Sequence, residues 1–431
     1  MHSRIESENP FPPIPFALPW IGREEEEAVL RVLRSGWLTT GKEALAFEKE
    51  FAQFLQSPPE HSAGDRGGEA LPHDSPSDSL HCLAVNSATS GLHLALEACG
   101  IGAGDLVLVP SYTFTSTAEI ARYLGAIPVF VDVKPGTFHL DPEKLEQTLA
   151  RLEKGLPAYS RGFGPRGVAK AVIPVHYGGL PCDMEAIGDL AARYRIKVIE
   201  DAAHSFPSRL DNGMFAGSIG DAGVFSFYAT KTITTGEGGM VVTRNRDTAA
   251  RISLMRSHGI DRSVWNRYTE TQASWYYEVV EAGYKYNFPD LLAAVGRVQL
   301  SRAWDLFRMR QSIAERYDLS FGAEEAFKLP PGGPGDARHL YPIRINASRL
   351  KINRDEFIKK LQKQGIGVSV HFIPLHIMPY YRDLYGLKPE DFPHSLNAFR
   401  EVISLPIWPG MTEEQIDRVI EVVTGTGREN S

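Results

Sequence analysis

The sequence predicts an α/β protein with a mostly parallel, seven-stranded sheet covered by helices on both faces, followed by a smaller α+β C-terminal domain. Between residues 83 and 243, short apolar runs alternate with helical patterns. The first five runs are nearly continuous and rich in β-branched residues, which is typical of strands buried on both faces of a parallel sheet. From about Gly283 the pattern changes to shorter strands mixed with amphipathic helices.

Each element follows from a local pattern. Before the sheet, helical periodicity predicts helices over Glu24–Arg34 and Lys42–Leu55. The predicted strands of the sheet are Leu83–Val85, Leu106–Val109, Pro128–Val133, Ala171–Val175, Lys197–Glu200, Gly223–Tyr228 and Met240–Thr243. In the C-terminal part we expect helices over Pro289–Phe307, Arg354–Gln364 and Glu413–Val423, and strands over His339–Ile345 and Gly367–His371.

We divide the chain into an N-terminal arm with the first helix (1–40), a large domain (41–282) and a small domain (283–431). The arm is proline-rich over residues 8–20 and is therefore predicted to be extended. Residues 57–79 are poor in apolar side chains and rich in Pro, Gly, Ser and charge, so they predict a surface insertion. A second loop is expected over 157–167.

Composition excludes several classes of protein. The chain has 46 basic and 53 acidic residues, a net charge of −7, and no basic tract, so we expect no nucleic-acid partner. Cys82, Cys99 and Cys182 show no metal-binding spacing and are interpreted as reduced thiols, with no metal site. No apolar run resembles a signal peptide or approaches membrane-spanning length, so we expect a cytoplasmic protein without a membrane partner.

Lys231 is the first candidate for chemistry. It lies in the stretch F-S-F-Y-A-T-K-T-I-T-T-G-E-G-G-M-V-V-T, between two runs that both look buried. By itself it reads as a solvated loop lysine. A lysine in a desolvated pocket, however, has a lowered pKa and is a nucleophile that forms imines with carbonyl compounds.

Other candidates follow the ends of strands, where ligands of open α/β sheets bind. Ser87, Thr89 and Ser90 begin a helix and suit either an anion site or ordinary N-capping. Phe114 suits either ring stacking or the core. His176 is as consistent with a buried structural histidine as with a catalytic one.

Asp201 ends an apolar strand, where an ionised carboxylate is costly unless it is paired. It could cap the next segment or act in a site, and His204 lies three residues further on. Pyridoxal 5′-phosphate (PLP) needs a lysine, a carboxylate for its ring nitrogen, a phosphate cup and usually an aromatic side chain over the ring. All four kinds of group are predicted at the carboxyl ends of strands in one sheet, which makes PLP the favoured ligand.

A family resemblance strengthens this hypothesis. N-S-A-T-S-G-L-H-L-A-L, P-S-Y-T-F, P-V-H-Y-G-G, I-E-D-A-A-H, the lysine stretch quoted above and G-Y-K-Y-N-F-P-D-L-L-A-A-V-G occur in this order. S-G-W-L-T-T-G near residue 35 and V-S-V-H-F-I-P-L-H near residue 368 also match. Over roughly residues 14–425 the chain resembles the DegT/DnrJ/StrS aminotransferases, which are PLP enzymes of fold type I that act on nucleotide-linked keto sugars.

The resemblance implies roles for four residues around the cofactor ring. Lys231 would be the Schiff-base lysine and proton shuttle, and Asp201 would pair with the pyridinium nitrogen. His204 would lie near the ring hydroxyl, and Phe114 would cover the ring face.

It also implies a phosphate site and a dimer. Thr89, Ser90 and Ser226 would hold the phosphate, and Asn287 would reach the phosphate bound in the neighbouring subunit of a homodimer. The arm and residues 37–40 would border the sugar pocket.

The implied reaction is transfer of an amino group, with L-glutamate as the donor, to a nucleotide-linked keto sugar in amino-sugar or cell-surface polysaccharide biosynthesis. A 4-ketone is favoured over a 3-ketone, because S-A-T-S-G and G-Y-K-Y-N resemble the 4-amino-sugar-forming members; Lys285, where many members have Asn, is shared with that group. Two alternative functions stay open: a non-catalytic regulator of the same fold, and an aminotransferase of a non-nucleotide substrate such as a keto-inositol. Lys231 disfavours the dehydratase branch, which has histidine there.

Overall fold

A seven-stranded sheet dominates the computed structural model, which describes residues 12–58, 79–159, 164–261, 276–333 and 335–431. The strand order is β1-β7-β6-β5-β4-β2-β3, and four of the six pairings are parallel. Among the described strands of this sheet, only the two pairings of β7 are antiparallel. The predicted mostly parallel sheet is therefore confirmed. The strands are β1 (His81–Val85), β2 (Leu106–Pro110), β3 (Ile127–Val131), β4 (Ala169–Val172), β5 (Lys197–Asp201), β6 (Ala222–Ser226) and β7 (Gly239–Thr243).

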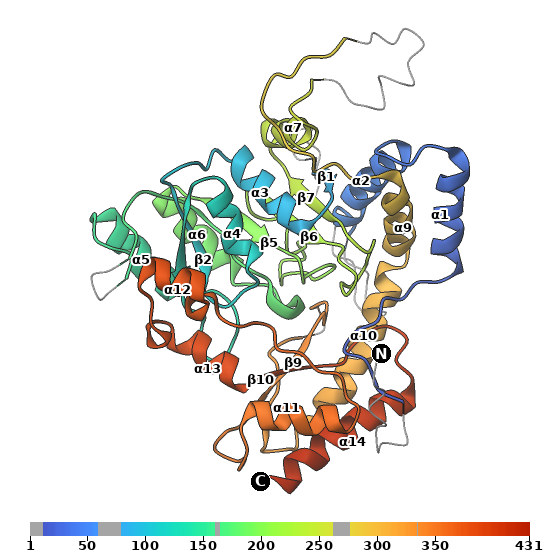
Figure 1. The fold of residues 1–431 in the computed structure, drawn as a ribbon, viewed down its shortest axis with the longest axis vertical. Coiled ribbons are helices and arrows are strands. Elements are labelled where there is room, and N and C mark those ends of the chain that lie inside the picture. The colour runs from blue at the N-terminus through green and yellow to red at the C-terminus, as the bar shows by residue number, and fades with distance from the viewer. Residues whose placement is uncertain (1–11, 59–78, 160–163, 262–275, 334) are drawn as a thin grey trace, which may run out of the picture.

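Both faces of this sheet are buried, because successive residues of a strand point to opposite faces. In β6, Val224 belongs to the cluster of buried side chains that contains Leu92 of α3. The next residue, Phe225, packs on the other face of the sheet with Phe47 and Phe51 of α2. Helices therefore cover both faces (Figure 1). They are α2 (Lys42–Leu55), α3 (Ala88–Ala98), α4 (Ser116–Tyr123), α5 (Pro142–Glu153), α6 (Met184–Tyr194), α7 (Arg246–Met255) and α9 (Asp290–Ser301).

A second, three-stranded antiparallel sheet with the order β10-β9-β8 lies near the C-terminus, below the large sheet in Figure 1. Its core is a separate cluster of buried apolar side chains. The elements of this part are α10 (Ala303–Phe321), β8 (Phe327–Lys328), β9 (Tyr341–Ile345), α11 (Arg354–Lys363), α12 (Pro379–Tyr385), α13 (Pro393–Glu401), β10 (Val402–Leu405) and α14 (Glu413–Glu429).

Two sequence predictions in this region are wrong. The helix expected over Pro289–Phe307 is two helices, because the backbone of Arg302 (φ −105°, ψ 6°) separates α9 from α10. The expected strand over Gly367–His371 forms a single bridge, from Ser369 to Ser404. This segment instead turns toward the large sheet and forms part of the wall of a cavity.

The N-terminal arm over residues 12–20 is extended and precedes α1 (Arg23–Ser35). Ile14 pairs the arm with the segment that follows α11. The Ile14 N–H donates to the Gly365 carbonyl, and the Ile14 carbonyl accepts from the Gly367 N–H, both at 2.8 Å. The surface insertion predicted over 57–79 lies almost entirely outside the described residues. Among the described helices, none has the length and apolar character needed to cross a membrane.

Candidate active site

A cavity of about 430 Å³ opens at the carboxyl ends of the strands. Three parts of the chain enclose it: the ends of the large sheet, the arm through Phe16 and Ala17, and the segments around His339 and His371. The predicted site residues that line it are Thr89, Phe114, Asp201, His204, Ser226 and Lys231. The folding of the sheet thus brings together residues that are up to 142 positions apart in sequence (231 − 89).

Lys231 follows β6 in a tight turn, in which its N–H donates to the Tyr228 carbonyl at 2.9 Å. Burial lowers the pKa of its ammonium group to about 8; the Asp201 carboxylate opposes this shift, and the Arg310 guanidinium adds to it. About a tenth of the amine is therefore unprotonated at pH 7, far more than for a solvated lysine, and a nucleophile requires this neutral form. The solvated-loop interpretation of Lys231 does not fit this environment.

Asp201 is the last residue of β5 and is 5% exposed. Its carboxylate accepts hydrogen bonds from the Thr117 hydroxyl (2.8 Å) and from the Ala203 N–H (3.2 Å). Burial raises its pKa, while the bonds from Thr117 and Ala203 and the positive charge of Lys231 act in the opposite direction. A protonated ring nitrogen in the cavity would restore the ionised form.

The start of α3 forms the polar floor of the cavity. Ser87, Ala88 and Thr89 line it. Ser90 instead turns back into the helix: its hydroxyl donates to Asn86 Oδ1 at 2.7 Å, and its N–H donates to the Ser87 hydroxyl at 3.1 Å. The structure therefore places Thr89, but not Ser90, where it can contact an anion.

A glycine permits the close approach of β7 to this helix start. A Cβ atom on Gly239 would lie 2.7 Å from the Ala88 nitrogen and 2.8 Å from the Ser87 carbonyl oxygen. Any side chain at this position would push the strand away from the helix N-terminus. Ser87, Ala88 and Thr89 at the start of α3 and Ser226 at the end of β6 consequently line the same cavity.

His204 and Phe114 lie on other sides of the cavity. His204 Nδ1 accepts the Gly178 N–H at 3.2 Å, so the proton of the neutral ring is on Nε2. Burial, reinforced by Lys231 and His371, holds its pKa well below the usual value. Phe114 is 56% exposed, and its ring centroid lies 5.8 Å from that of Phe372. It stands at the cavity wall and not in the core.

Asn287 and the 37–40 segment lie outside the cavity of their own chain, and next to each other. Asn287 Nδ2 donates to the Thr40 hydroxyl at 2.7 Å, and that hydroxyl donates to the Phe288 carbonyl at 2.7 Å. Asn287, which the resemblance assigns to the neighbouring subunit's phosphate, and residues 37–40, which it assigns to the border of the sugar pocket, thus form one group.

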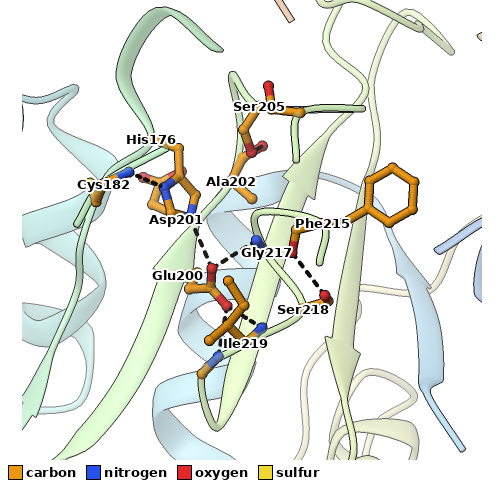
Figure 2. Close-up of polar contacts among 12 residues, drawn as sticks. His176, Cys182, Glu200, Asp201, Ala202, Ser205, Phe215, Gly217, Ser218 and Ile219 are labelled. Carbon is orange, nitrogen blue, oxygen red and sulfur yellow. Dashed lines mark hydrogen bonds and ion pairs between the residues drawn. The ribbon is translucent and has the colours of Figure 1, made fainter. Parts of the chain in front are cut away.

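His176 is fully buried and bonded to Glu200 at 2.9 Å (Figure 2). It is absent from the cavity lining, which favours the structural alternative. Sequence reasoning did not identify Thr117, Arg310 and His339. Arg310 donates to the carbonyls of His339 (3.3 Å) and Ile407 (2.8 Å), and no local motif marks a contact made between such distant segments.

These groups fit PLP. A lysine with a pKa of about 8 faces a buried carboxylate, and hydroxyls and a helix N-terminus supply donors for a phosphate. Within the described residues, no group of three or more His, Cys, Asp or Glu side chains is placed to hold a metal ion.

Comparison with known proteins agrees with this geometry. The chain is 41% identical over 423 residues to the spore coat polysaccharide biosynthesis protein SpsC of Bacillus subtilis, which covers 97% of this chain and 98% of SpsC. The fold matches the PMP-form of Spr1654 from Streptococcus pneumoniae, described as a sugar aminotransferase, with a TM-score of 0.81, 29% identity, and 96% and 99% coverage; a PLP-form also matches. DesI, solved in the presence of its TDP-sugar product, matches with a TM-score of 0.76, 26% identity, and 98% and 95% coverage.

The family model of the DegT/DnrJ/EryC1/StrS aminotransferases matches residues 19–64 and 77–424, which is nearly the whole chain. The fold, the chemistry of the cavity and the relatives identify a PLP-dependent aminotransferase. The chain belongs to the DegT/DnrJ/EryC1/StrS aminotransferase family.

Proposed function

We propose that the protein transfers an amino group from L-glutamate to the ketone of a nucleotide-linked sugar, with a 4-ketone favoured over a 3-ketone. The observation that carries the proposal is the placement of Lys231 and Asp201 in one cavity, where they interact electrostatically. The relationship to SpsC supports a role in polysaccharide biosynthesis, and the relationship to DesI supports a nucleotide-linked sugar.

The residues divide the work of holding PLP. Lys231 would bind the cofactor covalently, and Asp201 would accept a hydrogen bond from its ring nitrogen. Thr89 and Ser226 would hold the phosphate together with the start of α3. Phe114 would cover the ring face, and His204, whose neutral ring carries its proton on Nε2, would donate a hydrogen bond to the ring hydroxyl.

When bound, PLP supplies an electron sink that stabilises negative charge on the substrate carbon undergoing proton exchange. The Asp201 carboxylate, fixed by Thr117, would accept a hydrogen bond from the ring nitrogen and favour its protonated form. Lys231, with a pKa of about 8, can both accept and donate the proton near neutral pH. Burial of these groups strengthens their electrostatic interactions.

We also propose that two chains share each site. Asn287 and residues 37–40 are hydrogen-bonded to each other but lie outside the cavity of their own chain. In a homodimer, this group would complete the phosphate site and the sugar pocket of the partner.

The test uses the purified protein loaded with PLP. Glutamate alone should bleach the visible absorbance of the lysine-bound cofactor and yield one equivalent of 2-oxoglutarate per site. A panel of nucleotide-linked 4-keto and 3-keto sugars and a keto-inositol is then added and analysed by mass spectrometry. We expect an amino product from a 4-keto nucleotide sugar; aminated keto-inositol alone would overturn the proposed acceptor, and no response to glutamate would overturn the donor.

A further inference from the structure

Glu200 is a buried carboxylate with no role in the proposed amino-group transfer. It precedes Asp201 on β5, and its side chain points to the opposite face of the sheet. With 0% exposure, it accepts four hydrogen bonds: from His176 Nε2 (2.9 Å) and from the N–H groups of Gly217 (2.8 Å), Ile219 (2.7 Å) and Gly220 (2.7 Å). Figure 2 shows these bonds converging on its two oxygens.

Glu200 is ionised in this environment. Burial by itself would raise its pKa, but the hydrogen bonds from His176 and from the N–H groups of Gly220 and Gly217 bring the pKa below its usual value. A buried charge seldom improves stability over a well-packed apolar side chain. The four bonds therefore suggest that the carboxylate is needed for the arrangement of the groups around it.

His176 is fixed in one tautomer by this contact. Its Nδ1 accepts the Cys182 N–H at 3.0 Å, so the hydrogen of the neutral ring is on Nε2 and is donated to Glu200. The backbone of the same segment holds Asp201: the His176 N–H donates to the Asp201 carbonyl (3.1 Å), and the Asp201 N–H donates to the Pro174 carbonyl (2.9 Å). Glu200 thus anchors the segment to which the Asp201 backbone is bonded.

On its other side, Glu200 anchors the loop that enters β6. Three glycines shape this loop. Gly217 has φ +93°, a Cβ on Gly220 would lie 2.6 Å from the Val198 oxygen, and a Cβ on Gly223 would lie 2.0 Å from the Gly217 oxygen. The loop can therefore aim three N–H groups at one carboxylate. β6 then carries Ser226 to the cavity, and Lys231 follows five residues later.

We propose that Glu200 is a positioning residue: through His176 it fixes the end of β5, which places Asp201 in the cavity, and through the 217–220 loop it fixes the start of β6, which carries Ser226 there. The proposal rests on the proposed role of Asp201. The reason is geometric, since only a group that accepts hydrogen bonds on both oxygens can satisfy donors from the segment after β4 and from the entry to β6 together.

Glu200→Gln tests this assignment with little change in shape. The amide replaces one acceptor oxygen by an N–H donor, so it meets either the N–H groups of Ile219 and Gly220 or the Gly217 N–H together with the Nε2–H of His176. A change of tautomer would remove the Nε2–H of His176 from this clash, but it would leave the Gly217 N–H facing the amide and would turn Nδ1–H toward the Cys182 N–H. In ¹⁵N-resolved NMR of the cofactor-free protein, we expect the Nε2–H signal of His176 to shift or disappear.

The functional readout is the dissociation constant of PLP. Loss of one acceptor oxygen in the support should weaken PLP binding by about tenfold. Asp132→Asn is the matched control: Asp132 is 5% exposed and accepts the N–H groups of His394 and Ser395, but it lies outside the cavity lining. It should lower the melting temperature while leaving PLP affinity unchanged.

Two outcomes would overturn the proposal: an unchanged His176 signal in Glu200→Gln, or a PLP affinity that falls no more than in Asp132→Asn. If Glu200→Gln does not fold, His176→Leu keeps the three backbone donors to Glu200 and should give the same loss of PLP affinity; unchanged affinity there also overturns it. Asp201→Asn separates the two hypotheses. If that variant alone retains full PLP affinity and turnover, the role of Asp201 is wrong, whatever Glu200 does.

Discussion

Lys231 loses hydration inside the cavity, and this loss lowers its pKa from the usual value to about 8. The negative charge of Asp201 partly offsets this shift, and the positive charge of Lys231 in turn opposes the rise that burial causes in the pKa of Asp201. The sequence identified both residues because each follows an apolar strand. It could not show that Ser90 faces away from the cavity, because an N-capping serine and an anion-binding serine have the same local pattern.

The lowered pKa has a measurable consequence. Because the folded-state pKa is below that of a solvated lysine, the reactive neutral amine should be present from about pH 8 upward. In stopped-flow mixing with PLP, the rate at which the visible absorbance forms should rise about tenfold per pH unit below 8 and then level off. Lys231→Ala should give no such absorbance at any pH. A rate that keeps rising to pH 10 would mean that the lysine is solvated.

At the scale of the element, α2 illustrates a helix that is capped from a distance. Its N-cap residue is Gly41, which has no side chain to accept a hydrogen bond. Asp290, at the start of α9, accepts the Gly41 N–H (2.7 Å) and the Ala44 N–H (3.0 Å) with one oxygen and is 1% exposed. The cap thus joins α2 to the segment that carries Asn287.

Asp290→Ala should therefore lower the free energy of unfolding by about 1–3 kcal/mol, because two buried N–H groups lose their acceptor. Urea denaturation measures the change. Asp305→Ala is a suitable control, since Asp305 forms an exposed pair with Arg308 three residues along α10, and such pairs contribute about 0–1 kcal/mol. Equal losses in the two variants would show that the cap contributes little.

The element-scale predictions succeeded where one local pattern decides the structure. Apolar runs placed the strands of the large sheet within a few residues and put Asp201 at the end of one of them, whereas the strand that carries Ser226 ends two residues earlier than predicted. They failed where tertiary contacts decide it. Arg302 interrupts a helical pattern that looks continuous in sequence, and Gly367 is paired with the arm through Ile14, so its segment is not free to join the small sheet.

For the whole molecule, the sharing of sites between two chains can be tested by complementation. Lys231→Ala and Asn287→Ala should each be poorly active by themselves. If each chain donates Asn287 to its partner, a heterodimer of the two variants has one site with both residues intact, and an equal, randomly assembled mixture should regain about a quarter of wild-type activity. Activity equal to the average of the two separate variants would argue that each chain works alone.

The remaining site residues depend on the complete fold. His339 and Arg310 reach the cavity region because α10 and the segment before β9 fold back onto the large sheet; the Ala337 N–H, for example, donates to the Ser208 hydroxyl at 2.8 Å. No periodicity predicts a contact across 129 residues. The domain boundaries at residues 40 and 282 also stay predictions.

The extended arm links the backbone around residue 366 to the wall of the cavity. Ile14 is bonded on both sides to the backbone before and after Ile366, and two residues later the ring of Phe16 lies 5.3 Å from that of His371 at the cavity wall. If the part of the chain around residue 366 rotates away from the large sheet, it would carry Phe16 and His371 together. This side of the cavity wall would then move as one unit. The cavity could widen for a bulky acceptor while the hydrogen bonds between Ile14 and the backbone of Gly365 and Gly367 stay intact.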